Sequence, residues 1–510
     1  MSMEFLPAER PYVIVEIGGN HGGDIDRAKE YVTAAATSGA DAAKFQLYQA
    51  EHLRTERKIK KNTRLLRCMN TVLITVDSLR ADHLSQYGYH RETMPALDRI
   101  SEEGTVFEQA FSNGPYTRTS VPSFHTSTLA GYRNIEELTT IASALRGKDV
   151  YTAFFGTNSG HRSVIHGLGF DEYHDLRFDE SRSYGRSSPE QHPVVKRVSE
   201  VLDEHPTAYR LAQKVYDSVT DRGSGYNVGV YISAADVTDE TIEWLEETTD
   251  DDFFLWLHYM EAHRPYGLHD PDPAYTSTMS DSELKDLWKR VHQDPDGVSE
   301  SEHSLLIDQY DSNLRYCSRH LDRLFDTFKE QGLWEETNIL FSSDHGEEFH
   351  EHGLYNHHNL PYDELLSVPL LARGPDIKDT TVTQQRELLD VGPTILDFHG
   401  ADVPSTFQGE NLFEGDERQV ITLGASSYDE QVIAGRWDGW KFIWRESEEL
   451  LFNLDEDPGE TNNVVDQHPA VREHFLEEIP FELFDTPPEE LREPEDEVDR
   501  KRLKALGYID

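Results

Sequence analysis

The 510-residue sequence has only two cysteines, Cys68 and Cys317, so it offers neither a disulfide framework nor a CxxC motif. It has no apolar run near the 18 or so residues that a membrane-spanning helix needs. Its first residues, MSMEFLPAERPYVIVEIGGN, lack the basic start and long apolar stretch of a secretory signal. We therefore expect a soluble, cytoplasmic protein without a membrane span.

Positive charge is also scarce. The chain has 48 Lys and Arg against 96 Asp and Glu, which gives a formal net charge of −48. Contacts to phosphate backbones need clustered cations, so the composition excludes nucleic acid as a partner. The composition resembles that of proteins from salt-loving microbes such as haloarchaea. Self-repulsion among the carboxylates predicts a loss of stability at low salt.

What the chain does have is a dense set of ligand-type residues between two apolar runs. The run at 338–341 is typical of a buried strand and is followed by Asp344, His345 and Gly346. A carboxylate and an imidazole at the end of a strand are a common metal-site arrangement. The next apolar run, 367–371, is expected to be the neighbouring strand. Four more histidines stand between the runs: His350, His352, His357 and His358. We expect His350 and His352 to be solvated.

The same arrangement of a strand followed by polar residues recurs along the chain. Further strands are predicted at 71–76, 149–155 and 253–258, and helices at 302–332 and 387–400. The polar groups that follow strands or open helices are Asp77, Thr119/Ser120, Asn158/His161 and His258/His263. Strands that alternate with helices predict an α/β sheet with one active site at its carboxyl edge. Two late runs, 441–444 and 449–453, predict a smaller antiparallel sheet.

Residues 1–60 have a different character. Strands at 12–17 and 42–47 and a helix at 25–38 would form one βαβ unit. Residues 11–53 resemble the start of the N-acetylneuraminate (sialic acid) synthase family, whose fold is a TIM barrel. The matching positions are Glu16, Asn20, His21, Lys44 and Gln46. A barrel needs eight such units, so we interpret this fragment as a fusion remnant or a misplaced gene start. The alternative hypothesis is a synthase activity.

Five stretches then follow in order: TVLITVDSLRADHLSQYGY, FSNGPYTRTSVPSF, FFLWLHYMEAHRPY, NILFSSDHGEE and YDELLSVPLLARGP. Together they resemble the sulfatase family of the alkaline phosphatase superfamily, and LLFNLDEDPGETNNV and RLKALGYID resemble its C-terminal subdomain. The resemblance implies an alkaline-phosphatase-like α/β sandwich with a mostly parallel central sheet and a smaller antiparallel subdomain. The expected layout is a synthase-like fragment at 1–60, a basic junction at 61–68, a catalytic domain at 69–400 and a C-terminal subdomain at 401–510.

Sulfate and phosphate esters carry negative charge on the group under attack, so the site must neutralise charge and supply an oxygen nucleophile. The resemblance implies a metal-dependent sulfuric ester hydrolase, with a sulfated glycan as a candidate substrate. Oxygen-rich ligation favours Ca²⁺, Mg²⁺ or Mn²⁺, and histidine adds Zn²⁺, which we place last. The implied metal ligands are Asp77, Asp344, His345 and Ser120; the catalytic residues are Ser120, Arg118, His263 and His357; and the substrate-binding residues are Asn158, His258 and His358.

Several of these roles have alternatives. His357 or His358 fits one family position equally well, His258 also fits a core position, and Arg118 also fits a surface ion pair. In sulfatases the residue at Ser120 is oxidised to formylglycine, but the family's arginine is here Phe124 and its second aspartate is Ser78. A Lys-His pair of the family is replaced by GTNSGH. The alternatives are therefore a phosphodiesterase or phosphotransferase that uses unmodified Ser120, and a catalytically silent homologue.

Overall fold

The computed structural model describes residues 14–18, 42–45, 70–129, 135–148, 150–157, 162–176, 231–247, 252–357, 360–415, 418–425, 431–445, 447–480 and 483. The chain divides into two compact units, Met1–Arg67 and Cys68–Asp510. In the first unit, strands β1 (Ile14–Gly18) and β2 (Ala42–Phe45) pair in parallel. The helix expected between them lies outside the described residues.

An eight-stranded sheet forms the centre of the second unit, in the order β11-β4-β10-β9-β3-β8-β6-β7. Its middle strands are β3 (Asn70–Val76), β8 (Phe253–Tyr259), β9 (Thr337–Ser342) and β6 (Tyr151–Gly156), and neighbours among them pair in parallel. Nearly all of their residues are buried, because helices cover both faces, and this explains why the sequence shows continuous apolar runs instead of alternation.

The outer strands of the sheet are shorter. Strand β10 (Leu370–Arg373) runs antiparallel to β9 and begins three residues later than the sequence predicted, after Pro369. The remaining strands are β4 (Thr105–Phe107), β7 (Glu172–Asp175) and β11 (Thr380–Val382). A separate pair joins β5 (Ala110–Phe111) to β12 (Arg386–Glu387). The prediction of a mixed α/β fold with a mostly parallel central sheet is confirmed.

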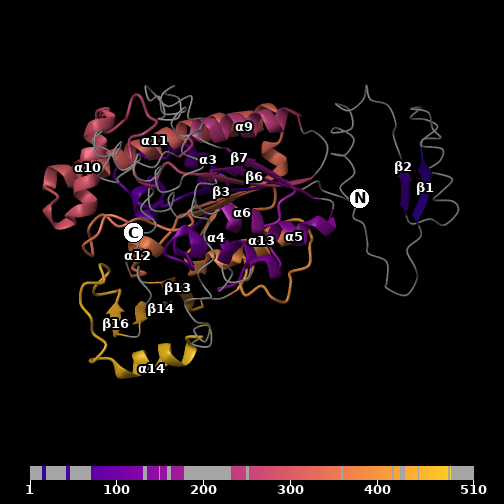
Figure 1. Ribbon diagram of the computed structural model, residues 1–510. Coiled ribbons are helices and arrows are strands. Elements are labelled where there is room, and N and C mark those ends of the chain that lie inside the picture. Colours follow the sequence, from indigo (N-terminus) through magenta and orange to yellow (C-terminus); the bar gives the residue numbers. More distant parts are fainter. Residues whose placement is uncertain are drawn as a thin grey trace, which may run out of the picture. The chain divides into compact units, whose positions relative to one another are not determined.

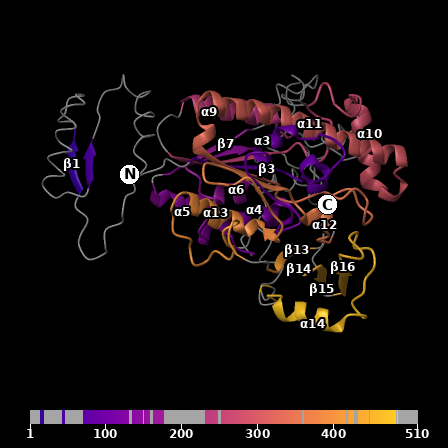
Figure 2. The same ribbon diagram turned by 180° about the vertical axis from the view of Figure 1, so that it is seen from behind.

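Helices cover both faces of this sheet (Figures 1 and 2). One face carries α3 (Asp98–Ser101), α9 (Ala234–Glu247) and the long α11 (Glu300–Glu330), which the side chain of Ser299 caps. The other face carries α4 (Thr117–Thr126), α5 (Ile141–Leu145), α6 (Arg162–Gly167) and α13 (Val391–Phe398). Two apolar clusters follow the same division, one on each side of the sheet. Helix α10 (Asp281–Gln293) lies at the left edge of Figure 1, and the short α12 (Asp363–Leu366) lies near the small sheet described next.

A second, smaller sheet is an antiparallel meander, as the sequence predicted. Its strands are β13 (Val420–Ala425), β14 (Gln431–Trp437), β15 (Trp440–Arg445) and β16 (Glu448–Asn453). Helix α14 (Pro469–Glu478) covers it, with the ring of Phe475 stacked on Phe442 at 5.6 Å between centroids. Figure 1 shows this small sheet beyond α12, on the side of the large sheet that carries α4.

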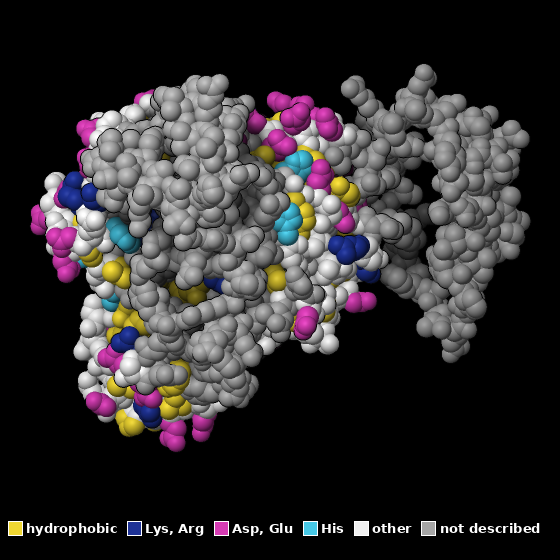
Figure 3. Space-filling model, in the orientation of Figure 1, with side chains coloured by type: hydrophobic (Ala, Val, Ile, Leu, Met, Phe, Trp, Pro, Cys, Tyr) yellow, Lys and Arg dark blue, Asp and Glu magenta, His cyan; other side chains and the backbone are white. Residues whose placement is uncertain are grey.

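The acidic residues are spread over the surface. Figure 3 shows Asp and Glu side chains around the edges of the visible face, with a few Lys and Arg between them. Among the described residues, no helix is both long and apolar enough to span a bilayer.

Candidate active site

Two neighbouring strands deliver three ligand-type side chains to one point. β3 ends at Val76 and leads directly into Asp77, and β9 ends at Ser342 and leads into Asp344 and His345. Because β3 and β9 are parallel and adjacent, both ends lie at the same edge of the sheet. All three side chains are almost completely buried, with at most 1% exposed.

The donor atoms of this trio form a tight cluster. One ligand atom from each of Asp77, Asp344 and His345 lies within 4.8 Å of the other two. His345 Nε2 is 3.7 Å from Asp77 Oδ1 and 3.5 Å from Asp344 Oδ2. Among the described residues, nothing donates a hydrogen bond to Asp344 Oδ2, although it is buried. A buried carboxylate oxygen without a donor, beside a second carboxylate and an imidazole, fits a divalent metal ion.

The turn after β3 holds the two aspartates in place. Ser78, where the family resemblance predicts a second aspartate, has φ of 62° and therefore lies in the left-handed region. Its Oγ donates to Asp77 Oδ1 at 2.8 Å, and its backbone N–H donates to Asp344 Oδ1 at 3.3 Å. The His345 N–H donates to the same Asp344 oxygen at 3.0 Å. Ser78 thus orients both carboxylates without adding a third negative charge.

The electrostatics of the cluster separate the two aspartates. Burial alone would raise the pKa of Asp77, but His263, His258 and His345 outweigh it and hold that pKa well below its usual range. Burial, together with the charge of Asp77, raises the pKa of Asp344. Two buried carboxylates this close repel each other, so a bound cation would stabilise the arrangement.

A hydroxyl group reaches the cluster, and it belongs to Thr117. Thr117 is the first residue of α4, and its Oγ1 donates to Asp77 Oδ2 at 3.2 Å and lies 3.1 Å from His345 Nε2. Ser120, which the sequence motif favoured, lies one helical turn further on. Its Oγ is buried and has no hydrogen-bond partner among the described residues. Sequence reasoning missed Thr117, although its place at the start of the Ser/Thr-rich helix was a usable signal.

The position of the family's arginine belongs to the apolar core. Phe124 is 2% exposed and meets Trp256 edge-on at 6.1 Å between ring centroids. His125 beside it contacts the same Trp256 at 4.4 Å, and burial lowers the pKa of His125 well below its usual value. The deeper part of α4 is therefore packing surface.

Two predicted histidines also lie at the cluster. The ring of His357 is 4.6 Å from that of His345 and 5.4 Å from that of His263, centroid to centroid. His357 Nδ1 is 3.1 Å from Glu347 Oε1, whose pKa is raised to about 7 by burial. Burial lowers the pKa of His263 to about 4 despite the nearby Asp77. The His357–Glu347 pair is the arrangement that orients an imidazole for proton transfer.

The other predicted residues fall in different places. His258 is buried on β8, with Nδ1 2.8 Å from Thr75 Oγ1 and Nε2 3.4 Å from Asp77 Oδ2, so it supports the cluster from the neighbouring strand. Arg118 follows Thr117 in the first turn of α4 and is half-buried. Asn158 and His358 lie outside the described residues, as does His161.

The histidines expected to be solvated are held by neighbours. The prediction that His352 is solvated is wrong, because its Nδ1 is 2.5 Å from Glu364 Oε1 and its ring stacks on Tyr362 at 3.5 Å between centroids. The contact partner is twelve residues away on α12, which no local pattern could show. His350 is half-buried, and its Nε2 is 3.2 Å from Asp296.

Comparison with known proteins gives a coherent result. The family model described as Sulfatase matches residues 69–401. An arylsulfatase from Clostridium perfringens is 24% identical over 464 residues, which covers 81% of this chain and 92% of that protein. A choline-sulfatase from Rhizobium meliloti is 29% identical over 167 residues, covering 31% of this chain and 32% of that protein.

Solved structures agree on the fold. The phosphonate monoester hydrolase of Agrobacterium radiobacter superposes with a TM-score of 0.59 at 17% identity, covering 80% of this chain and 94% of that one. A protein solved with its substrate D-glucosamine-2-N,6-O-disulfate superposes with a TM-score of 0.57 at 16% identity, covering 86% of this chain and 98% of that one. The resemblance of residues 11–53 to sialic acid synthases is not shown by these comparisons and stays a prediction.

Proposed function

Because the chain belongs to the sulfatase family, we propose that it hydrolyses sulfuric esters with Thr117 as the nucleophile, beside a divalent metal ion held by Asp77, Asp344 and His345. The observation that carries this proposal is the Thr117 hydroxyl, which contacts both Asp77 and His345. A divalent ion at this place supplies charge neutralisation of the ester and a lower pKa for a neighbouring hydroxyl.

The chain's own residues account for the remaining steps. Thr117 Oγ1 attacks sulfur and loses its proton to solvent, and the bond from sulfur to the alcohol oxygen breaks. His357, oriented by Glu347, gives a proton to the departing oxygen, so the alcohol leaves neutral. Water then attacks the threonine sulfate, which restores the hydroxyl and releases hydrogensulfate. In this scheme His263 borders the sulfate, and Arg118 in the same helical turn as Thr117 contributes positive charge.

The metal preference and the substrate class are finer parts of the proposal. Two carboxylates and one imidazole favour Mn²⁺ or Mg²⁺, with Ca²⁺ next and Zn²⁺ last. A sulfated glycan is a reasonable substrate, since one structural neighbour was solved with a disulfated glucosamine. Formylglycine at Ser120 is the competing proposal for the nucleophile, and it fits poorly with the core position of Phe124.

The test compares two hydroxyl variants on one aryl sulfate. Purified protein with added Mn²⁺ should cleave para-nitrophenyl sulfate. Thr117→Ala should lower kcat by at least about 10³-fold, whereas Ser120→Ala should keep kcat within about tenfold. Peptide mapping of residues 112–132 should find both side chains unmodified. A loss of two hydrogens at Ser120, together with an inactive Ser120→Ala, would assign the nucleophile to Ser120 instead. Cleavage of an aryl phosphodiester without any cleavage of the sulfate would refute the sulfuric ester assignment.

A further inference from the structure

A buried chain of hydrogen bonds lies behind Asp77 and takes no part in the proposed reaction. It consists of Trp256 and His258 on β8 and Thr75 on β3, which we call the relay. Trp256 Nε1 donates to Thr75 Oγ1 at 2.9 Å, and Thr75 Oγ1 is 2.8 Å from His258 Nδ1. The other ring nitrogen of His258, Nε2, is 3.4 Å from Asp77 Oδ2. The relay therefore leads from the core of the sheet to a carboxylate of the cluster.

The register of the sheet brings the relay together. Thr75 and His258 are direct partners in the parallel pairing of β3 with β8. Trp256 comes two residues before His258, so both side chains lie on the same face of the sheet. Trp256 is 0%, Thr75 2% and His258 3% exposed. Because water is excluded, the polar groups of the relay depend on one another for their hydrogen bonds.

The indole of Trp256 is held in place by other rings. Its ring centroid is 4.4 Å from that of His125, 4.7 Å from that of Phe154 and 6.1 Å from that of Phe170. An indole nitrogen donates a hydrogen bond and cannot accept one. The Thr75 oxygen therefore accepts from Trp256, and the direction of this first hydrogen bond is fixed.

The Thr75 hydroxyl in turn fixes the tautomer of His258. Since its oxygen accepts from Trp256, its proton needs another acceptor, and among the described residues the one in contact is His258 Nδ1. A proton on Nδ1 would leave the buried Thr75 hydroxyl without an acceptor, which is costly. His258 Nδ1 is therefore the acceptor, and the proton of the ring lies on Nε2, which faces Asp77.

This tautomer gives Asp77 a donor at each oxygen from a fixed direction. Ser78 Oγ donates to Asp77 Oδ1 at 2.8 Å. His258 Nε2 faces Oδ2, which also accepts from Thr117 Oγ1 at 3.2 Å. The residue behind a metal ligand sets the orientation of that ligand, and its loss typically weakens metal binding about 10- to 100-fold. The opposite tautomer would turn a lone pair of His258 toward the carboxylate.

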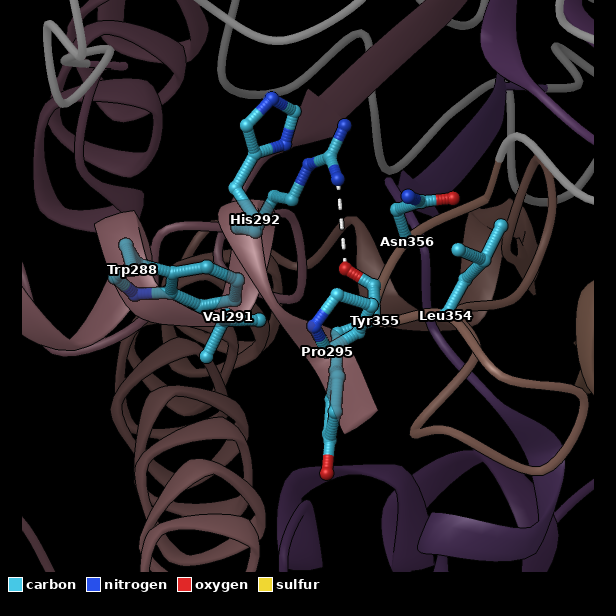
Figure 4. A pocket seen from close by; sticks show the side chains of 8 residues that line it. Trp288, Val291, His292, Pro295, Leu354, Tyr355 and Asn356 are labelled. Atoms are coloured by element: carbon cyan, nitrogen blue, oxygen red, sulfur yellow. Dashed lines mark hydrogen bonds between the residues drawn. The ribbon is translucent and has the colours of Figure 1, made fainter. Parts of the chain in front are cut away.

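The segment after β8 supports the site at a second, separate place. Arg264 lies in this segment, and its Nη1 donates to the Tyr355 carbonyl at 3.4 Å, the dashed line in Figure 4. This bond joins the segment to the backbone of the loop that leads to His357, and neither of its partners belongs to the relay. A change in the relay should therefore act on Asp77 and leave this loop in place.

We propose that Thr75 is a positioning residue for the metal site. Its hydroxyl, oriented by Trp256, holds His258 in the tautomer that donates to Asp77. The inference rests on the proposed function, because it takes a divalent ion to bind at the cluster that contains Asp77. Thr75 acts through His258 and not by contact with the ion, and its role involves no proton transfer.

The first test measures the Kd of Mn²⁺ by calorimetry on the full chain. Thr75→Val keeps the shape of the side chain without the hydroxyl and should weaken binding by about tenfold or more. Thr75→Ser keeps the hydroxyl without the methyl group and should stay within about threefold of wild type. Thr71→Val is the matched control, because Thr71 lies on the same face of β3, is 0% exposed and has an Oγ1 without a partner among the described residues. It should leave the Kd unchanged.

The second test needs no metal. Nitrogen NMR of protein with ¹⁵N-labelled histidine reports which ring nitrogen carries the proton, and the signals of His258 are those lost in His258→Gln. Wild type and Thr75→Ser should show the unprotonated nitrogen at Nδ1 and the proton on Nε2. In Thr75→Val the Nδ1 signal should shift, because its hydrogen-bond donor is gone.

The outcomes separate the relay from the metal site. A role of Thr75 in packing alone predicts the opposite order, with Val like wild type and Ser impaired, and that order would overturn the proposal. A proton on Nδ1 of His258 in wild type would overturn it as well. If wild type binds no Mn²⁺, the metal site of the proposed function fails, and the spectrum alone decides whether Thr75 sets the tautomer.

Discussion

Replacing Asp344 by asparagine should stabilise the metal-free protein while removing its response to metal. Asp344 Oδ1 accepts from the backbone N–H groups of Ser78 and His345, and the amide oxygen of asparagine keeps both bonds. The change falls on Oδ2, which has no hydrogen-bond donor among the described residues. Burial first, and the charge of Asp77 second, raise the pKa of Asp344, so its carboxylate form opposes folding.

The magnitude follows from the cluster's dimensions. Two unit charges within 4.8 Å repel by at least about 3.5 kcal/mol at an effective dielectric constant of about 20. Attraction between Asp344 and His345, at 3.5 Å, offsets part of this repulsion. We expect Asp344→Asn to raise the free energy of unfolding by about 1–2 kcal/mol without metal. Wild type should gain about 4 kcal/mol from metal at a thousand times its Kd, and the variant should lose most of that gain.

The assay is urea unfolding followed by tryptophan fluorescence, in EDTA and in Mn²⁺. Asp296→Asn serves as the control, because Asp296 is 88% exposed and is not one of the three residues of the cluster. It should change the free energy of unfolding by less than about 0.5 kcal/mol and keep the full response to metal. A variant at position 344 that is less stable than wild type in EDTA would refute the reasoning, as would one that keeps the full metal response.

Three further predictions concern stability. Changing Lys441 to methionine should lower the free energy of unfolding by about 3 kcal/mol, because Lys441 is buried with Asp363 at 2.7 Å and Glu460 at 3.2 Å. A loss of less than about 1 kcal/mol in urea unfolding would contradict this. Burial raises the pKa of Glu460 to about 7, so the folded state keeps a proton that the unfolded state loses, and stability falls as pH rises from about 4.5 to 7. Glu460→Gln should flatten this part of the pH profile; an unchanged slope would count against it. Raising KCl from about 0.1 M to 3 M should raise Tm, because salt screens the net charge of −48; a flat scanning-calorimetry series would exclude self-repulsion as a destabilising force.

The sequence was informative wherever burial imposes continuous apolar runs. The runs at 71–76 and 253–258 correspond to β3 and β8 within one residue at each end. The run at 338–341 lies within β9, whose parallel pairing with β3 brings Asp77, Asp344 and His345 together at one edge of the sheet. The antiparallel small sheet was also predictable, from short runs at its third and fourth strands.

The hydroxyl that contacts the cluster was harder to predict, because motif matching and helix geometry disagree. The Ser-Val-Pro-Ser pattern favours Ser120, but the hydroxyl that meets the cluster depends on where α4 begins. Tyr116 is extended, with φ of −156°, so the helix begins at Thr117 and Ser120 comes one turn later, about 4.5 Å along the axis. For the same kind of reason, the pairing of His352 with Glu364 depends on tertiary contacts that one sequence does not display.

The adjacency of β3 and β9 also has a kinetic consequence. Ser78 and Asp344, which join the two halves of the cluster, are 266 residues apart in sequence. Closing so long a loop is slow, and no partly folded state with only one of these strands in place can offer the complete ligand set. Metal should therefore act late in folding, by slowing unfolding of the finished sheet while leaving the folding rate nearly unchanged. The ion would then stabilise the native state after it has formed and would not promote its formation.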